Sequence, residues 1–211
     1  GDCCLIETPK HQKILIDGGG QKNFDIGKNT LLPYLFNRKI LEIDYCIISH
    51  FDQDHCGGIL YILEQIKVKN VIIGKQYEDS TNYNKFKEIV KKQNLNVKIV
   101  EAGMRINIEK NLYFDVLWPY SQKMISDNAI NNNSLVCKLN YNKFSMLFTG
   151  DIEEIAEKEI VLKYANNTSI LKSTILKTAH HGSKTSSIEK ILDVVKPQYA
   201  FIGVGENNTF G

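Results

Sequence analysis

The segment Ser49–Gly58 concentrates side chains that bind metal ions. It reads Ser-His-Phe-Asp-Gln-Asp-His-Cys-Gly-Gly, which places His50, Asp52, Asp54 and His55 within six consecutive positions. Imidazole and carboxylate groups are common protein ligands of divalent cations. A single Asp or His is ordinary in a loop, but four of them directly after an apolar run favour a metal site. A divalent cation bound by these residues would activate water for hydrolysis.

Two later segments also end apolar runs with metal-binding side chains. Thr149-Gly150-Asp151 brings a carboxylate, and His180-His181-Gly182-Ser183 brings paired histidines. Ligands at the carboxyl ends of strands in an α/β fold meet at the rim of a sheet. We therefore expect these residues to join the first cluster in a centre for one or two metal ions.

The elements that position these residues are short apolar runs alternating with helical stretches. A buried strand over Ile43–Ser49 leads into the first cluster, and alternation along an extended segment puts His50, Asp52 and Asp54 on one side, with His55 at a turn. The other expected strands are Cys4–Thr8, Lys13–Asp17, Val71–Gly74, Val97–Val100, Leu112–Leu117, Ser134–Tyr141, Phe144–Thr149, Ser173–Thr178 and Tyr199–Val204, and the expected helices are Asn29–Asn37, Gly58–Ile66, Tyr83–Gln93, Ile152–Tyr164 and Ile188–Val195. This alternation predicts an α/β layered fold.

The composition is that of a globular protein. The chain has 211 residues, of which 43% are hydrophobic and 24% charged, and its formal net charge is +2. This composition excludes a disordered tail, and the charge is too balanced to indicate nucleic-acid or membrane binding by itself. The apolar runs are strand-sized and too short to span a bilayer. Five cysteines without a Cys-x-x-Cys pair predict free thiols, and we expect Cys56 to have a packing role.

The motifs resemble those of the metallo-β-lactamase superfamily and, more narrowly, those of the carboxy-terminal domain of the ComEC family, the DNA-uptake channel proteins of competent bacteria. The residues that carry the resemblance are Gly1-Asp2, Ile16–Gly19, Ser49–Gly58, Asn132–Ser134, Thr149–Asp151 and His180–Ser183. The resemblance implies an αβ/βα sandwich, with two mixed β-sheets and helices on the outer faces. It also implies a single domain over residues 1–211, belonging to a larger membrane protein and truncated at both ends.

The resemblance further implies two metal sites that share Asp151. One site would take His50, Asp52, Asp151 and one histidine of the His180-His181 pair, and the other would take Asp54, His55 and Asp151. Asp52, Asp54 and Asp151 would be the catalytic carboxylates. Asp17 would orient a ligand or a loop without binding a metal itself.

Three departures from the superfamily pattern qualify this ligand set. Asp52 stands where most members have a histidine, and the harder carboxylate favours Mn²⁺, with Mg²⁺ or Zn²⁺ as alternatives. Asn133 and Ser134 stand where many members have a third histidine, so a histidine of the later pair would fill that role. ComEC-like domains continue past Phe210-Gly211 into His-Pro, so the second site would be incomplete in this chain and the first would fill more readily.

The function implied by the resemblance is a metal-dependent phosphodiesterase that degrades the DNA strand that is not imported. Candidate substrate contacts are Asn133, Ser134, Lys177, Ser183 and Lys184. The domain would lie on the extracytoplasmic face of the bacterial cell membrane, beside the membrane channel domains of the same protein. Its oligomeric state stays open.

Two other functions remain as alternatives. One is a DNA-binding module whose chemistry is degenerate, and the other is a hydrolase of a lactone or another ester that is not a nucleic acid. The alternative location is the cytoplasm, where the chain would be a freestanding hydrolase, because free cysteines suit a reducing compartment.

Overall fold

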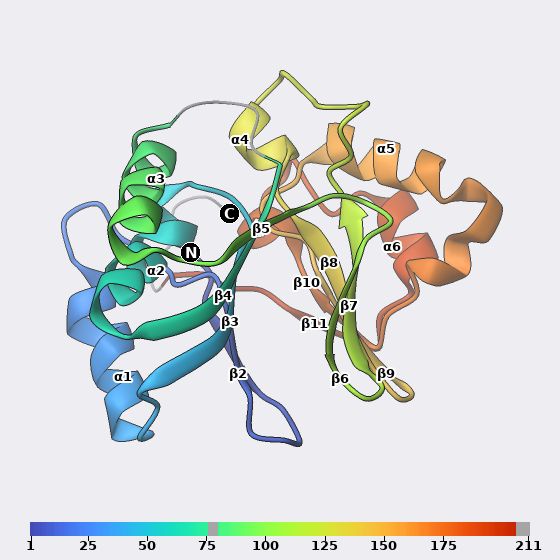
Figure 1. Ribbon diagram of the computed structural model, residues 1–211. Coiled ribbons are helices and arrows are strands. Elements are labelled where there is room, and N and C mark those ends of the chain that lie inside the picture. The colour runs from blue at the N-terminus through green and yellow to red at the C-terminus, as the bar shows by residue number, and fades with distance from the viewer. Residues whose placement is uncertain (76–79, 206–211) are drawn as a thin grey trace. The chain divides into compact units, whose positions relative to one another are not determined.

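The computed structural model describes residues 1–75 and 80–205. The chain divides into two compact units, Gly1–Ile99 and Val100–Gly211. Each unit contains one mixed β-sheet with helices, as Figure 1 shows. The predicted α/β class with two mixed sheets is therefore confirmed. Phe210 and Gly211, where the sequence departs from the ComEC pattern, lie outside the described residues.

The first unit is built on a sheet with the strand order β1-β2-β3-β4-β5. Its elements are β1 (Cys4–Glu7), β2 (Lys13–Ile16), η1 (Gly27–Leu31), α1 (Leu32–Asn37), β3 (Glu42–Ile48), α2 (Gln53–Gln65), β4 (Lys67–Gly74), α3 (Thr81–Gln93) and β5 (Val97–Val100). The predicted hairpin of β1 and β2 is antiparallel, whereas β2, β3 and β4 run parallel to one another. The carboxyl ends of β2 and β3 therefore lie side by side.

The core of the first unit joins one face of this sheet to its helices. Strand residues Leu15, Cys46 and Val71 are buried together with Leu35 of α1, Ile59 of α2 and Phe86 of α3. Burial of such side chains contributes about 1.5–3 kcal/mol each. Cys56 belongs to the same buried cluster, and burial raises the pKa of its thiol, which fits the expected packing role.

The second unit is built on a sheet with the strand order β11-β10-β9-β8-β7-β6. Its elements are β6 (Arg105–Glu109), β7 (Leu112–Trp118), α4 (Ala129–Asn132), β8 (Val136–Tyr141), β9 (Phe144–Phe148), α5 (Glu154–Lys163), η2 (Ala165–Ile170), β10 (Ile175–Lys177), η3 (Ala179–Gly182), α6 (Glu189–Val195) and β11 (Tyr199–Phe201). Strands β6 to β9 are antiparallel neighbours, and β9, β10 and β11 are parallel. The carboxyl ends of β9 and β10 are again adjacent.

Several boundaries differ from the expected ones. Helix α2 begins at Gln53 and not at Gly58, β4 begins at Lys67 and not at Val71, and strand β6 was not expected. Within the described part of the chain, no helix is both long and apolar enough to cross a membrane.

The glycines around α2 allow two backbones to approach closely. The Gly58 N–H donates to the Gly19 carbonyl oxygen at 2.8 Å, and the Gly18 N–H donates to the His55 carbonyl oxygen at 2.7 Å. A Cβ atom added at Gly58 would lie 2.0 Å from the Gly18 carbonyl oxygen. The segment after β2 is therefore fastened to the first turns of α2.

We predict that Gly58→Ala lowers the free energy of unfolding by about 1–3 kcal/mol, because backbone atoms must shift to admit the methyl group. Gly57→Ala is the matched control in the same helix. Its new Cβ would meet the flexible Gln53 side chain, 2.4 Å from Nε2, and alanine favours a helix by about 1 kcal/mol over glycine. Urea denaturation measures both variants. Equal midpoints for the two would contradict the close approach.

Candidate functional site

The first set of candidate ligands follows the parallel strands β2 and β3. Asp17 comes directly after β2, and Ser49 and His50 come directly after β3. Ile16 of β2 pairs with Ile47 of β3, so the two strands end at the same edge of the sheet. Asp17, Ser49 and His50 are therefore brought together at the rim of this sheet.

Asp17 is the centre of a buried hydrogen-bond network. Its Oδ1 accepts from the Ser49 N–H at 2.8 Å, and its Oδ2 accepts from the Ser49 hydroxyl at 2.7 Å. The His55 Nδ1–H donates to the same Oδ2 at 2.9 Å. Ser49 Oγ in turn lies 2.9 Å from His50 Nδ1. Because the Ser49 proton is committed to Asp17, His50 Nδ1 donates to Ser49.

This network leaves Nε2 of both His50 and His55 with a lone pair, which is the form of histidine that binds a metal. His50 Nε2 lies 3.9 Å from Asp52 Oδ2. Two ligands of one cation stand roughly 3.0–3.5 Å apart when each bond is about 2.1 Å. A small movement of the half-exposed Asp52 would bring both atoms onto one ion, so the donor set fits a divalent cation.

The predicted extended conformation of residues 50–54 is wrong beyond Asp52. Asp52 is the N-cap of α2, and its carbonyl oxygen accepts from the N–H groups of His55 at 3.0 Å and Cys56 at 2.9 Å. Asp54 and His55 therefore lie in the first helical turn. Their side chains leave the backbone about 100° apart around the helix axis, and not on opposite faces of a strand.

Asp2 is a candidate ligand that sequence reasoning included in a motif without assigning it a role. A carboxylate oxygen of Asp2 and a ring nitrogen of His55 lie within 4.8 Å of each other. The Asp2 carbonyl oxygen also accepts from the Gly19 N–H at 2.6 Å, which fixes this residue beside the segment that follows β2.

The second set of candidate ligands follows the parallel strands β9 and β10. Asp151 comes shortly after β9, and its Oδ2 lies 3.4 Å from His181 Nε2. The His181 Nδ1–H donates to the Gly203 carbonyl oxygen at 2.9 Å, so Nε2 carries the lone pair. This spacing suits two ligands of one cation. Within this unit the donor geometry favours His181 over His180 as the ligand.

His180 has a different environment. Its Nδ1 lies 3.4 Å from Glu153 Oε1 and 3.4 Å from the Thr185 hydroxyl. The backbone at His180, His181 and Gly182 is left-handed, with φ of 48°, 54° and 75°. Such a conformation is costly for residues other than glycine and persists only where other contacts enforce it.

Glu157 of α5 holds the segment that follows this turn. Its side chain is buried and accepts hydrogen bonds from the N–H groups of Ser187 at 2.7 Å and Ile188 at 2.9 Å. Burial raises the pKa of Glu157, although these two donors oppose the increase. The Ser186 hydroxyl donates to the Ala179 carbonyl oxygen at 3.0 Å. The segment after the paired histidines is thus tied to both α5 and η3.

The predicted substrate contact by Asn133 is not supported by its surroundings. Its amide nitrogen donates to the carbonyl oxygens of Ile125 and Ala129, both at 2.7 Å, and its Oδ1 accepts from the Ile125 N–H at 3.0 Å. Both amide hydrogens are therefore engaged with the backbone. Ser134 Oγ accepts from the Asp151 N–H at 3.3 Å, which positions Asp151.

The remaining predicted contacts lie around η3. The Lys177 ammonium, at the end of β10, donates to the Thr178 carbonyl oxygen at 2.7 Å. Ser183 Oγ lies 3.0 Å from the Thr185 hydroxyl, and Lys184 is exposed. Their ammonium and hydroxyl groups are of the kind that binds phosphate oxygens.

Sequence reasoning missed three positioning residues. Ser49, Glu153 and Glu157 each hold a candidate ligand or its loop, and Ser49 was given no role although it opens the Ser49–Gly58 motif. Ser49 adjoins His50, and a hydroxyl next to a ligand histidine was the one available signal. The roles of Glu153 and Glu157 depend on tertiary contacts with residues 180–188.

Comparison with known proteins gives a consistent result. The family model of the metallo-β-lactamase superfamily matches residues 1–119. ComE operon protein 3 of Bacillus subtilis is 32% identical over 100% of this chain and 28% of its own length. Recombination protein 2 of Haemophilus influenzae is 30% identical over 92% of this chain and 22% of its length. Competence protein ComA of Neisseria gonorrhoeae is 28% identical over 98% of this chain and 26% of its length.

The chain thus spans about a quarter of the length of these curated relatives. Among solved structures, Igni18, a metallo hydrolase from Ignicoccus hospitalis, aligns with a TM-score of 0.58 and 16% identity over 94% of this chain and 76% of its own. CmlA, a diiron β-hydroxylase from Streptomyces venezuelae, aligns with a TM-score of 0.57 and 14% identity over 94% and 42%. At these identities the two structures show a shared fold.

Proposed function

The chain belongs to the metallo-β-lactamase superfamily, and from this premise we propose that it is a divalent-metal-dependent phosphodiesterase that hydrolyses DNA. The competence proteins among its relatives support DNA as the substrate. We further propose that residues 1–211 form one metallo-β-lactamase-like domain of a longer membrane protein. That domain would lie on the extracytoplasmic face, beside the membrane channel of the same protein.

The observation that carries the proposal is the hydrogen bonding of three histidines at Nδ1. His50, His55 and His181 each use Nδ1 in a hydrogen bond within the protein, which directs the lone pair of Nε2 to a ligand. Asp52 and Asp151 lie near Nε2 of His50 and His181, respectively. Each unit thus has one histidine Nε2 beside a carboxylate. This arrangement supports metal binding better than a purely structural role.

We propose that these histidines and carboxylates are ligands of one or two metal ions. The proposed ligands are His50, Asp52, Asp54, His55, Asp151 and His181. A bound divalent cation would supply Lewis-acid activation of water and would neutralise charge on a phosphate. The carboxylate of Asp52 favours Mn²⁺ over the zinc preferred by histidine-rich sites.

The other side chains support this chemistry. Asp17 and Ser49 keep protons on Nδ1 of His55 and His50. Lys177 and Ser183 supply an ammonium and a hydroxyl that suit the oxygens of a phosphodiester. The proposed reaction is attack of water at phosphorus with departure of a sugar hydroxyl.

The experiment is hydrolysis of end-labelled single-stranded and double-stranded DNA by the purified chain, with Mn²⁺, Mg²⁺ or Zn²⁺ and with EDTA. We expect cleavage that requires a metal and is fastest with Mn²⁺, and the end labels report its polarity. Isothermal titration calorimetry with each metal provides the parallel measure of occupancy. Metal binding without DNA cleavage in any metal would overturn the proposal, and DNA binding that persists in EDTA would then indicate a binding module.

A further inference from the structure

The first unit contains a hollow beside the candidate ligand Asp54. It has a volume of about 440 Å³ and is lined by the loop of residues 20–26, by Gln53, Gly57 and Tyr61 of α2, and by Lys85 of α3. A second hollow shares Gly20–Lys22 and Gln53 with the first and reaches Asp54. We call these two together the loop-20 hollow. Its position next to a proposed metal ligand suits a substrate site.

The loop-20 hollow is lined by two cationic side chains, Lys22 and Lys85, and by two carboxylates, Asp25 and Asp54. Among residues 1–75 and 80–205, neither Lys22 nor Lys85 forms an ion pair with a carboxylate. The Asp25 carboxylate accepts from the Lys28 N–H at 2.9 Å and is engaged locally. Within these described ranges neither ammonium group is paired, so both can approach phosphates, which dominate the affinity of proteins for nucleic acids.

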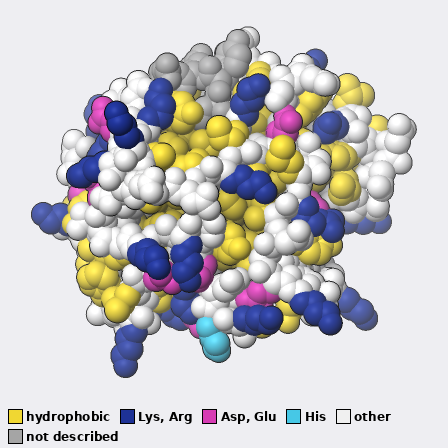
Figure 2. Space-filling view, viewed as in Figure 1, with side chains coloured by type: hydrophobic (Ala, Val, Ile, Leu, Met, Phe, Trp, Pro, Cys, Tyr) yellow, Lys and Arg dark blue, Asp and Glu magenta, His cyan; other side chains and the backbone are white. Residues whose placement is uncertain are grey.

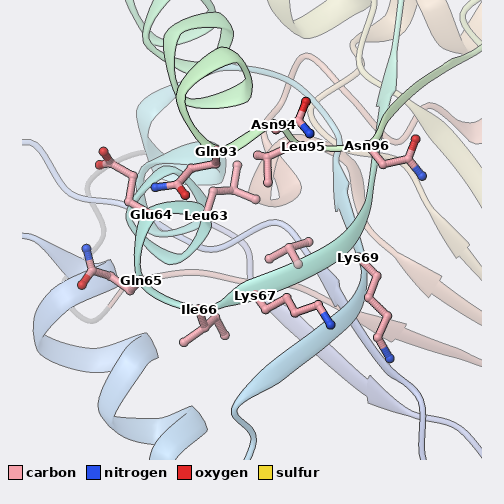
Figure 3. Close-up of a pocket in the computed structure, with 11 residues that line it drawn as sticks. Leu63, Glu64, Gln65, Ile66, Lys67, Lys69, Gln93, Asn94, Leu95 and Asn96 are labelled. Carbon is pink, nitrogen blue, oxygen red and sulfur yellow. The ribbon is translucent and has the colours of Figure 1, made fainter.

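A third cavity in the same unit, of about 580 Å³, has lysines that form ion pairs. It is lined by the ends of α2 and α3 and by the first residues of β4, and Figure 3 shows Lys67 and Lys69 at its edge. Lys67 lies 2.8 Å from Glu42, and Lys69 lies 2.7 Å from Asp44. These cations are already neutralised. The cavity also lies at the start of β4, whereas Asp17 and His50 follow the ends of β2 and β3.

The loop-20 hollow also carries aromatic surface. The Phe24 side chain lines it and is 46% exposed, and Tyr61 contributes a second ring. An exposed ring next to unpaired lysines is the arrangement on which unstacked bases of a single strand bind, because every base has a face that can stack. Bases within a duplex are stacked on one another and are not available to Phe24.

Lysines are dispersed on one face of the protein. On the face drawn in Figure 2, Lys and Arg side chains are scattered among hydrophobic and neutral ones. Overall charge therefore gives little preference for any DNA-binding surface. The loop-20 hollow is distinguished by the combination of unpaired lysines, an exposed aromatic ring and proximity to Asp54.

We propose that the loop-20 hollow binds an unpaired nucleotide of single-stranded DNA, with Phe24 stacked on the base and with Lys22 and Lys85 on the adjacent phosphates. This inference rests on the proposed function and gives it a substrate class, a strand whose bases are free at the site of cleavage.

The test is fluorescence anisotropy of labelled oligothymidylate with the full chain in EDTA, where binding is separated from cleavage. We expect Lys22→Ala and Lys85→Ala each to weaken binding about threefold to fivefold and to reduce the salt slope by about 0.7, the value for one phosphate contact on a single strand. Phe24→Ala should weaken binding about tenfold, and Phe24→Tyr, which keeps the ring, should restore it. Duplex DNA should show no effect of Phe24→Ala.

Lys91→Ala is the matched control, because Lys91 is an exposed lysine of the same helix as Lys85 but does not line the hollow. If the Lys22, Lys85 and Phe24 variants bind like Lys91→Ala, the inference is overturned, whereas metal-dependent cleavage by the unmodified chain would still support the proposed function. If the variants lose affinity but the unmodified chain cleaves no DNA in any metal, the hollow is supported as a binding site and the proposed hydrolysis of DNA is refuted. Tighter binding of oligouridylate than of DNA would also overturn the inference.

Discussion

Asp151→Asn is expected to reduce metal-dependent DNA hydrolysis by about a thousandfold or more. Asp151 is the proposed ligand shared by both metal sites, and its Oδ2 lies 3.4 Å from His181 Nε2. Asparagine has nearly the same volume but no charge, so it removes a ligand oxygen and the attraction to the cation. Losing several kcal/mol of electrostatic stabilisation in the transition state corresponds to this factor.

The control for Asp151→Asn is the same change at an exposed position. Asp193 lies on the surface of α6, and Asp193→Asn should leave hydrolysis unchanged within about twofold. Turnover with Mn²⁺ is measured for both, and circular dichroism checks that both fold. An Asp151→Asn protein that is folded and retains a tenth of the original turnover would remove Asp151 from the metal ligands.

Asp17→Asn is expected to weaken metal binding by about 10–100-fold, the usual loss when a partner that orients a ligand histidine is removed. Asp17 accepts from the His55 Nδ1–H and from both donors of Ser49. Asparagine tolerates the positive φ of 54° at this position, so the backbone should persist. Its amide would donate to His55 Nδ1 and move the proton to Nε2, which then has no lone pair for a metal.

Two measurements separate this role from a loss of stability. Calorimetric titration with Mn²⁺ gives the affinity, and nitrogen NMR shifts of the histidine rings report the tautomer of His55 in the metal-free protein. Asp44→Asn is the control, because Asp44 also accepts from a backbone N–H, that of Lys13 at 2.8 Å, but has no contact with the ligands. Unchanged affinity together with an unchanged His55 tautomer would refute the orienting role of Asp17.

The layered α/β class could be predicted from the sequence because its strands appear as clear apolar runs. The runs that became β3, β8 and β9 are apolar and bounded by turn residues, and the structure places them within one or two residues of their expected limits. The positions of the candidate ligands were also predictable, because they follow regular strands. His50 and Asp151 follow buried strands, and the rule that sites form at strand ends applies to each.

The start of α2 was not predictable from local preference. Gly57 and Gly58 each disfavour a helix by about 1 kcal/mol relative to alanine, so the residues before them read as a loop. The structure places both glycines inside the helix because Gly58 contacts the segment at Gly18 and Gly19. A tertiary contact therefore reverses the local preference.

The choice between His180 and His181 depends on backbone geometry that adjacent histidines do not encode by themselves. Successive residues in a left-handed turn direct their side chains differently from residues in a strand. His181 in that turn bonds to the Gly203 carbonyl oxygen, and the segment that follows the turn bonds to Glu157 of α5. Sequence reasoning therefore reached the pair and could not separate its members.

The contacts of Glu157 restrict how this protein can change in length during evolution. Asp151 and Glu157 both act on the segment that contains His181, one beside its ring and one at its far end. A single residue inserted within the first turn of α5, which begins at Glu154, would turn Glu157 by about 100° around the helix axis and carry it away from the Ser187 and Ile188 N–H groups. Homologues that keep both residues should therefore tolerate substitutions in that turn but no insertions or deletions.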